Sequence, residues 1–290
     1  MKKLISTAFF LILIILSHTS FSEVLRMSPE ELKQKLADKQ LIILDARTTE
    51  AYQAGHIQGA LSYPVNLTYE NQQINGKISQ PVATQKKFRQ LGIAKNSPVV
   101  IYDNGNLVDA ARLFWVLEVY GLSRVKVLDH GYDNWLGKNF PVSLDEHKVL
   151  PSQYVTSINH KRLASKFTTQ LATRNSNQLI IDARAISDYI GKTSSAKRFG
   201  HIPTAISIPS SQNMVLDDGF ASLKPIDDLT EVYADIPKDK KIVIYCSFGR
   251  VSASNYLALR ELGYDVSNYD ASWNEWANDF NLPIEKPVDQ

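Results

Sequence analysis

The chain has 290 residues, of which 44% are hydrophobic and 21% are charged, a length and composition that suit a folded protein of two domains. Its 32 Lys and Arg nearly balance its 30 Asp and Glu, so it lacks the basic excess of a nucleic-acid-binding surface. The six histidines include no pair at the three- or four-residue spacing with which a helix holds a metal ion. We therefore expect no nucleic-acid partner, no metal and no cofactor.

The first 22 residues have the pattern of an export signal. Two lysines precede an uncharged apolar stretch of thirteen residues, 4–16, and Ser20 and Ser22 provide a small-x-small cleavage site before Glu23. The apolar stretch is shorter than the roughly 20 residues that span a bilayer. We expect residues 1–22 to be removed and the protein to be exported to the bacterial periplasm without a stable membrane anchor. Retention of the segment as an anchor is the alternative.

The rest of the chain consists of two copies of one sequence pattern. An apolar run ending in Asp-Ala-Arg and followed by a Gly-His-Ile segment occurs in both copies, with 137 residues between Asp45 and Asp182. A second apolar run that ends in a short polar loop also occurs in both, with 143 residues between Asp103 and Cys246. The similar offsets predict two domains of one fold that differ by a few insertions.

Each copy alternates apolar strand patterns with helical patterns. In the first copy the expected elements, in chain order, are a helix over residues 29–38, a strand over 41–44, a strand over 99–102 and a helix over 110–120. This alternation predicts an α/β fold in which each domain is a mostly parallel sheet with helices on both faces. We expect an N-terminal domain over residues 23–145, a linker over 146–160 and a C-terminal domain over 161–290.

Cys246 is the single cysteine of the chain and directly follows the predicted strand 242–245. A short polar loop separates it from a helix that we expect to be capped by Ser252 and closed by Gly263. Backbone N–H groups in such a loop, together with the helix N-terminus, favour the thiolate over the thiol. A lone thiol in an oxidising compartment has no internal disulfide partner. Cys246 is therefore predicted to be a nucleophile, with a small buried packing residue as the alternative.

In their order and duplication, these motifs resemble a tandem-domain rhodanese, the family of thiosulfate and 3-mercaptopyruvate sulfurtransferases. The resemblance covers essentially the whole chain after the export signal and rests on Asp-x-Arg, Gly-His-Ile, the Cys-x-x-Gly loop and the Gly-Tyr-x-x-Trp type of ending. It implies that Cys246 attacks the outer sulfur of a small anionic donor, becomes a persulfide and passes the sulfur to cyanide or a thiol acceptor. We expect the protein to act as a monomer.

The resemblance also implies a set of site residues. By position, Cys246 is the nucleophile and Arg184 contacts the donor anion. The loop residues implied to bind substrate are Ser247, Phe248, Gly249, Arg250 and Val251. A guanidinium beside the thiolate suits a sulfonate or carboxylate. The alternatives are that Arg184 pairs with Asp182 to hold the strand end and that Arg250 points to solvent.

Asp103 stands in the first copy where Cys246 stands in the second. Because a carboxylate cannot carry sulfur and repels anions, we expect the N-terminal domain to be inactive and structural. A role for Asp103 in tuning the active site from near the domain interface is the alternative. His56 and His201 occur in both copies, which favours a structural role in a turn over acid–base catalysis.

The loop sequence also bears on the donor and on rival functions. The residues after Cys246 match neither the basic pattern of thiosulfate-specific members nor the small-residue pattern of mercaptopyruvate-specific members, and the one cation, Arg250, favours thiosulfate slightly. A phosphatase with a related fold needs an arginine six residues after the cysteine, where Ser252 stands, so phosphate-ester hydrolysis is not expected. A module that carries a persulfide without turnover, or that only binds a partner, remains the alternative.

Overall fold

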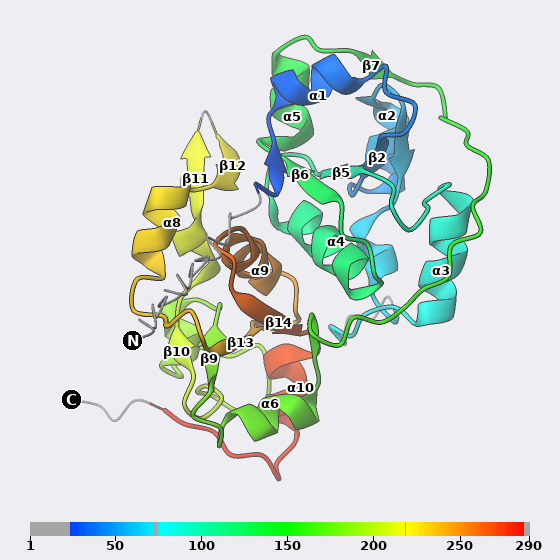
Figure 1. Cartoon of the computed structure of the whole chain (residues 1–290). Helices are drawn as coiled ribbons and strands as arrows, with labels where there is room; N and C mark the ends of the chain where they lie inside the picture. Colours follow the sequence, from blue (N-terminus) through cyan, green and yellow to red (C-terminus); the bar gives the residue numbers. More distant parts are fainter. Residues whose placement is uncertain (1–23, 72–74, 218, 287–290) are drawn as a thin grey trace, which may run out of the picture.

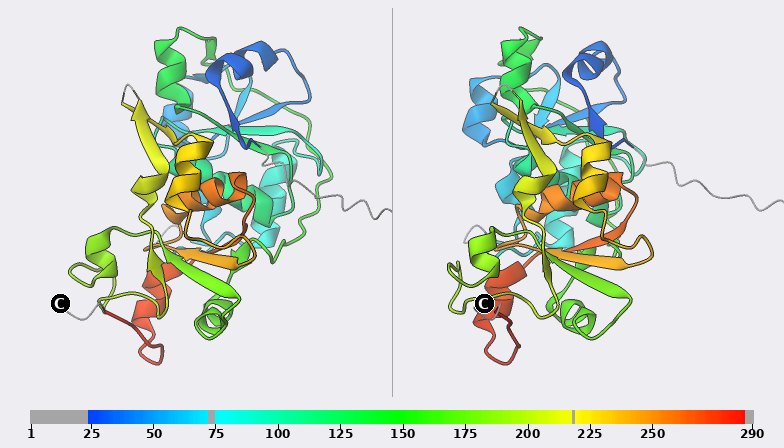
Figure 2. Two further views of the ribbon diagram at one scale, coloured as in Figure 1. Left: turned by 60° about the vertical axis from the view of Figure 1, so that its left-hand side comes forward. Right: turned by 90° about the vertical axis from the view of Figure 1, so that its left-hand side faces the viewer.

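The computed structural model describes residues 24–71, 75–217 and 219–286 and contains two α/β domains, with the second domain below the first in the views of Figures 1 and 2. The predicted export signal lies outside the described residues. None of the helices in the described part of the chain has the length and apolarity to cross a bilayer.

The first domain is built on a five-stranded parallel sheet in the order β1-β6-β5-β2-β4. The strands of the domain are β1 (Arg26–Met27), β2 (Ile42–Asp45), β3 (His56–Ile57), β4 (Ala60–Ser62), β5 (Val99–Tyr102), β6 (Val125–Leu128) and β7 (Val142–Ser143). Its helices are α1 (Pro29–Lys35), α2 (Thr49–Ala54), α3 (Pro81–Gln90), α4 (Val108–Val119) and α5 (Gly131–Gly137), with a 3₁₀ turn, η1 (Val65–Thr68). β3 and β7 form a separate antiparallel pair.

The second domain repeats this architecture with a parallel sheet in the order β10-β9-β13-β14-β8. Its strands are β8 (Leu163–Ala164), β9 (Gln178–Asp182), β10 (Ile206–Ser207), β11 (Met214–Asp217), β12 (Phe220–Leu223), β13 (Lys241–Tyr245) and β14 (Asp265–Tyr269). Its helices are α6 (Lys166–Ala172), α7 (Ile186–Tyr189), α8 (Ile226–Val232), α9 (Ser252–Glu261) and α10 (Ser272–Asn278), with a 3₁₀ turn, η2 (Ser210–Asn213). The strand order relative to the chain is the same in both sheets, which confirms the predicted duplication.

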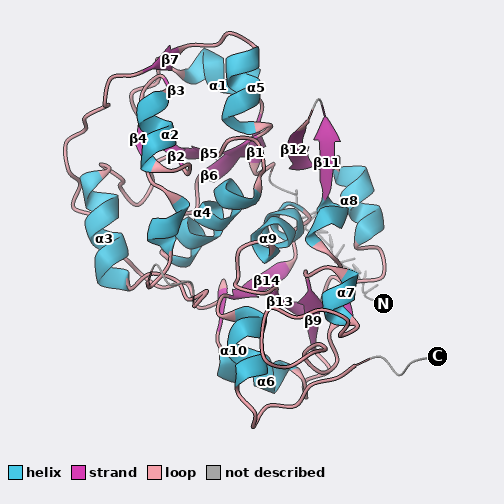
Figure 3. Ribbon diagram, turned by 180° about the vertical axis from the view of Figure 1, so that it is seen from behind, coloured by secondary structure: helices cyan, strands magenta, loops and turns pink. Residues whose placement is uncertain are grey.

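Helices cover both faces of each sheet, as the sequence predicted. In β2, Ile43 packs in the cluster that includes α1, α2 and α5, whereas Leu44 packs in the cluster that includes α3 and α4. In β13, Val243 and Ile244 likewise belong to clusters on opposite faces. Figure 3 shows α6 and α10 on one side of the second sheet and α9 on the other. Apolar residues on both faces are what a parallel sheet covered on both sides requires.

The helix boundaries differ slightly from the predicted ones. The helix expected over 29–38 ends at Lys35, and its successor residues turn because the Asp38 carboxylate accepts the Gln40 N–H at 2.9 Å. Between β7 and β8, residues 144–162 contain no helix or strand. The segment predicted as the linker falls in this stretch, which the first domain holds through a 2.7 Å hydrogen bond from Arg89 Nε to the Tyr154 carbonyl.

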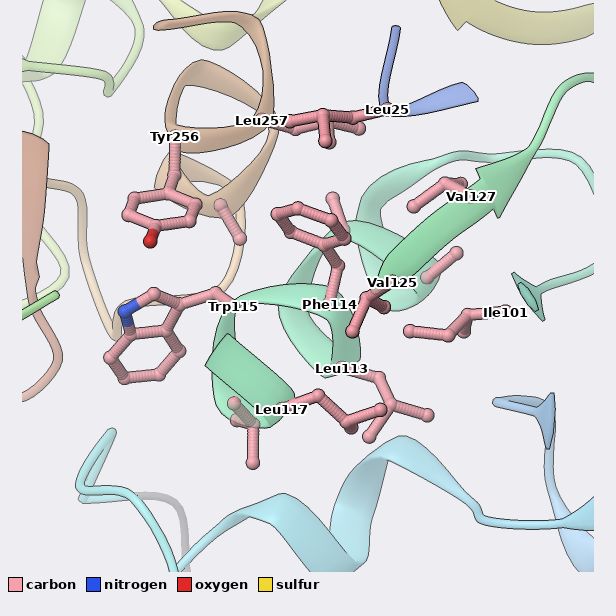
Figure 4. Packing of buried hydrophobic residues seen from close by; sticks show 14 of the residues in the cluster. Leu25, Ile101, Leu113, Phe114, Trp115, Leu117, Val125, Val127, Tyr256 and Leu257 are labelled. Atoms are coloured by element: carbon pink, nitrogen blue, oxygen red, sulfur yellow. The ribbon is translucent and has the colours of Figure 1, made fainter. Parts of the chain in front are cut away.

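The two domains meet through α4 and α9. One continuous hydrophobic cluster runs through both domains and includes Phe114 and Trp115 of α4 and Tyr256 of α9 (Figure 4). At the edge of this cluster the Glu118 carboxylate accepts hydrogen bonds from Tyr256 Oη (2.6 Å) and Arg260 Nη2 (2.8 Å). The buried contact fixes the loops of one domain against those of the other.

Each domain also extends a hairpin onto the other. The β11–β12 hairpin of the second domain donates a backbone hydrogen bond of 2.7 Å to the Gly105 carbonyl in the first. The first domain has a matching turn closed by the bridge between Tyr69 and Ile78, and the Ile78 N–H donates to the Asp270 carboxylate at 2.7 Å. The end pairs of the two hairpins are offset by 145 residues. The first domain therefore packs directly against the loops around Cys246.

Candidate active site

Cys246 lies at the carboxyl end of β13, the central strand of the second sheet, immediately before the loop that leads into α9. Its N–H donates to Ser272 Oγ at 3.2 Å, and its carbonyl accepts from the Trp273 N–H at 2.9 Å. The residue is 1% exposed. The sulfur is thus held at the edge of the sheet where open α/β folds place their reactive groups.

The loop residues predicted to bind substrate form a tight turn between Cys246 and α9. Gly249 has a φ of +67°, and a Cβ at this position would lie 2.3 Å from the Asp270 carbonyl oxygen, so only glycine fits here. Ser247 and Phe248 are half-buried, whereas Arg250 is exposed. The loop therefore has a fixed, closely packed backbone with one mobile cation at its edge.

Ser252 has a position that the sequence did not indicate. We expected it to cap α9, but the N-cap is Val251, without a side-chain hydrogen bond. Ser252 Oγ instead lies 3.4 Å from Cys246 Sγ and 2.9 Å from Asn268 Oδ1. Since the hydroxyl has one proton, it donates to Asn268 beside a thiol and can rotate to donate to the sulfur when the thiol ionises. Ser252 is therefore placed to stabilise the thiolate.

The backbone amides expected to cradle the sulfur do not contact it. Within the described residues, Ser252 Oγ is the one hydrogen-bond partner of Cys246 Sγ. In the first copy, by contrast, the Asp103 carboxylate accepts hydrogen bonds from four amides, those of Gly105 (2.8 Å), Asn106 (3.1 Å), Leu107 (3.2 Å) and Ala110 (3.0 Å). Burial raises the pKa of Asp103, and these hydrogen bonds oppose the shift. The first-domain loop is thus an anion site filled by its own carboxylate, which supports the prediction that this domain is inactive.

Arg184 is buried against an acidic residue of its own domain. Its Nε lies 3.0 Å from Asp182 Oδ1, its Nη2 lies 2.6 Å from Asp182 Oδ2, and Nη2 also donates to the Gly200 carbonyl at 2.7 Å. Arg47 makes the same pair with Asp45 in the first copy, at 2.7 Å. The structure therefore shows the ion pair that holds the strand end. Contact of Arg184 with the donor stays a prediction.

Arg250 forms an ion pair across the domain interface. Its Nε and Nη2 each lie 2.7 Å from Asp109 Oδ1 of α4, and its side chain is 47% exposed. Burial lowers the pKa of Arg250, but the Asp109 carboxylate more than offsets this and the pKa is raised. Arg250 is therefore neither free beside the sulfur nor simply directed into solvent, because it is bound to the other domain at the edge of the loop.

The two histidines occupy equivalent turns. Nδ1 of His56 lies 2.9 Å from the Tyr52 carbonyl oxygen, and Nδ1 of His201 lies 2.8 Å from that of Tyr189. Each imidazole stacks on the same tyrosine, with ring centroids 3.8 Å and 3.9 Å apart. Identical contacts in both copies agree with a structural role. Among the described residues no cluster of three or more His, Cys, Asp or Glu is arranged to hold a metal ion.

Two residues of the first domain reach the Cys246 loop, although the sequence analysis did not place them there. Arg112 of α4 is 0% exposed and donates from Nη1 to the Gly249 carbonyl at 2.7 Å. The Tyr69 ring centroid lies 3.8 Å from the Arg112 guanidinium carbon. Burial raises the pKa of Tyr69, and negative charge on Cys246 adds to this shift while the nearby arginines oppose it. The available signal was that Arg112 is the one basic residue in the helix predicted over 110–120.

Comparison with known proteins identifies this architecture. The sequence model of the rhodanese-like domain family matches the chain twice, over residues 28–138 and 165–279. The chain belongs to the rhodanese family. The resemblance inferred from the sequence motifs is therefore confirmed.

Relatives of this rhodanese cover most of its length. It is 32% identical over 254 residues to a "Putative thiosulfate sulfurtransferase" of Haloferax volcanii, which covers 82% of this chain and 86% of the relative. It is 26% identical over 273 residues to the 3-mercaptopyruvate sulfurtransferase of Escherichia coli, covering 88% of this chain and 95% of the relative. The crystal structure of SseA from Escherichia coli, a 3-mercaptopyruvate sulfotransferase, matches with a TM-score of 0.77 at 24% identity and covers 87% of this chain and 100% of that one. This match confirms the predicted rhodanese fold.

Proposed function

We propose that this rhodanese is a sulfurtransferase that moves a sulfane sulfur from thiosulfate, or from 3-mercaptopyruvate, to cyanide or a thiol through a persulfide on Cys246. The observation that supports it most directly is the position of the single cysteine at the end of the central strand of the second sheet. The relatives named for these two donors support the same class of reaction.

In the first half-reaction the Cys246 thiolate attacks the outer sulfur of thiosulfate. A new S–S bond forms as the bond between the two donor sulfurs breaks, and sulfite leaves with the electron pair. With 3-mercaptopyruvate the C–S bond breaks instead, and the carbon takes a proton to give pyruvate. The Ser252 hydroxyl, 3.4 Å from Sγ, stabilises the attacking anion.

In the second half-reaction the acceptor attacks the outer sulfur of the persulfide. The S–S bond on Cys246 breaks, and its electron pair returns to the protein as the thiolate. Cyanide then leaves as thiocyanate, and a thiol leaves as its own persulfide. The cycle needs no redox partner, because the sulfur is transferred without net oxidation of the protein.

The Asp103 loop supports the persulfide step. An aspartate and a cysteine persulfide place their terminal atom equally far from the backbone, so the outer sulfur corresponds to a carboxylate oxygen and Sγ corresponds to the carboxylate carbon. Four amides bind the Asp103 oxygens, and the 143-residue offset assigns the corresponding amides to residues 248, 249, 250 and 253. We infer that these amides bind the outer sulfur of the persulfide, which accounts for the lack of amide contacts to Sγ.

We further propose that the protein acts as a monomer in the bacterial periplasm after residues 1–22 are removed, with no membrane anchor. The motif Ser20-Phe21-Ser22 before Glu23 supports this location. The intact mass of protein recovered from the cell envelope tests it. A chain that begins near Glu23 is expected, whereas a chain that begins at Met1 and needs detergent for extraction would refute it.

Turnover with excess cyanide tests the activity. The mature protein is incubated with thiosulfate or 3-mercaptopyruvate, thiocyanate is measured for both donors, and pyruvate is measured for the second. Many turnovers per protein are expected, and none with Cys246→Ser. A single sulfur per protein molecule, with no further thiocyanate, would favour the persulfide carrier over the enzyme. Thiocyanate formation by the Cys246→Ser protein would refute the assignment of the nucleophile.

A further inference from the structure

Arg112 is a buried cation at the interface between the domains. Its side chain makes three hydrogen bonds, from Nε to Thr68 Oγ1 (3.0 Å), from Nη1 to the Gly249 carbonyl (2.7 Å) and from Nη2 to the Gly76 carbonyl (3.3 Å). All three acceptors are neutral. Within the described residues, Arg112 takes part in none of the ion pairs. A fully buried charge without a carboxylate partner is costly unless another anion balances it.

Cys246 is the anion in its field that has no other cation. Burial lowers the pKa of Arg112, and negative charges on Tyr69, Asp270 and Cys246 oppose that shift. Burial raises the pKa of Tyr69, so its phenol is neutral at neutral pH. The Asp270 carboxylate already accepts two backbone N–H groups, at 2.7 Å each. The remaining cation of the loop, Arg250, is paired with Asp109.

The repeat shows that the cation accompanies the cysteine rather than the scaffold. The 143-residue offset places Asn255 of α9 where the first copy has Arg112. Asn255 is neutral, and its Nδ2 donates to the Ile208 carbonyl (3.0 Å) and to Tyr233 Oη (3.2 Å) within its own domain. The copy that lacks the cysteine therefore supplies the buried charge, and the copy that contains the cysteine does not.

We propose that Arg112 is a positioning residue of the active site, which provides from the N-terminal domain the buried cation that faces the anionic sulfur of Cys246. Its hydrogen bond to the Gly249 carbonyl holds the turn of the loop, and its charge stabilises first the thiolate and then the persulfide anion. The N-terminal domain is thus unable to carry sulfur itself and is necessary for the chemistry of its partner domain. The persulfide part of this inference rests on the proposed sulfurtransferase function.

The test compares two substitutions in the full chain. Arg112→Met removes the charge and keeps an unbranched side chain in the space, and the Gly249 carbonyl retains the hydrogen bond from Asn268 Nδ2 at 3.3 Å. Arg112→Lys keeps the charge. Arg260→Met is the matched control, because it removes another arginine of the same interface, whose 2.8 Å partner is Glu118. Arg112→Gln supplies the neutral variant should Arg112→Met fold poorly.

The readout is the rate at which iodoacetamide alkylates Cys246, the single cysteine, measured from neutral to alkaline pH. At neutral pH we expect Arg112→Met to react about 10- to 50-fold more slowly than the parent, as a nearby charge at the effective protein dielectric implies. The difference should vanish at alkaline pH, where every variant is a thiolate. Arg112→Lys should stay within about threefold of the parent, and Arg260→Met should match it.

A purely structural role predicts a different pattern. Arg112→Met would then lower the melting temperature while its alkylation rate stayed equal to that of the parent at every pH, and this result would overturn the proposal. The alkylation rates do not depend on sulfur transfer. If the parent failed to convert thiosulfate and cyanide to thiocyanate, the proposed function would fall, and the comparison of Arg112→Met with the parent would still decide the role of the cation.

Discussion

The Arg250 guanidinium lies 2.7 Å from the Asp109 carboxylate, so the cation of the Cys246 loop is paired with a residue of the other domain. The 143-residue offset makes Asp109 the first-copy equivalent of Ser252. The Arg250 side chain is 47% exposed and the Asp109 side chain 15% exposed. An anionic donor that approaches the loop must therefore compete with Asp109 for Arg250.

Release of Arg250 should strengthen donor recognition. We predict that Asp109→Asn raises kcat/KM for thiosulfate by about 3- to 10-fold, while Arg250→Ala lowers it by about 10-fold or more, the value of a charge-assisted hydrogen bond. Steady-state thiocyanate formation measures both. If the two variants each stay within about twofold of the parent, the donor binds without Arg250, and the backbone amides and Arg184 are left to recognise it.

The Ser252 hydroxyl should assist formation of the persulfide. We predict that Ser252→Ala slows single-turnover sulfur uptake from thiosulfate by about 5- to 20-fold, because the thiolate loses one hydrogen bond to a polar group. Ser254 is the matched control in the same helix, since its hydroxyl bonds to the Val251 carbonyl at 2.8 Å. Equal uptake rates for Ser252→Ala and Ser254→Ala would show that the Ser252 hydroxyl does not act on the sulfur.

Much of the fold could be predicted from local sequence. Runs such as 41–44 and 242–245 are apolar and mostly branched at Cβ or Cγ, so they are stable only as strands buried on both faces. The duplication of these runs gave two domains and placed Cys246 at the edge of a sheet. The Asp-x-Arg spacing also allowed the pair between Asp182 and Arg184, because a guanidinium two residues along the chain reaches the carboxylate.

The interdomain contacts of the site could not be predicted in this way. Arg112 and Gly249 are 137 residues apart, and Asp109 and Arg250 are 141 apart. They meet only because α4 packs on α9, a geometry that depends on the shapes of many side chains rather than on a motif. The direction of the Ser252 hydroxyl depends on Asn268 of a neighbouring strand, so the helix-start pattern alone suggested a cap.

The first-domain loop should not become a second active site when it receives a cysteine. It has Asp109 where the second loop has Ser252, and the second copy has Asn255 where the first has Arg112. A thiolate there would face a carboxylate without a buried cation, and like charge opposes both ionisation and anionic donors. We predict that Asp103→Cys combined with Cys246→Ser forms thiocyanate at least about 100-fold more slowly than the parent. Comparable turnover would mean that the nucleophile alone distinguishes the domains.

Asp129 should make stability depend on pH. Burial raises its pKa to about 6, and within the described residues its Oδ1 has no hydrogen-bond partner. The ordinary value in the unfolded chain is about 3.9, so the native state holds the proton more tightly and the free energy of unfolding falls as the pH rises between these two values. We predict that Asp129→Asn is more stable than the parent by about 1 to 3 kcal/mol near pH 7 and equally stable near pH 4. Urea denaturation at both pH values measures this, and an equal loss at both would contradict the burial of an ionised carboxylate.

The most direct test of the central claim is the intact mass of the mature protein after exposure to thiosulfate and then to cyanide. We predict that the parent gains one sulfur, about 32 Da, and loses it to cyanide as one equivalent of thiocyanate, as expected of a cysteine persulfide. The Cys246→Ser protein should gain nothing. A parent protein whose mass does not change while thiocyanate still forms would show that no persulfide lies on the path and that Cys246 is not the carrier of the sulfur.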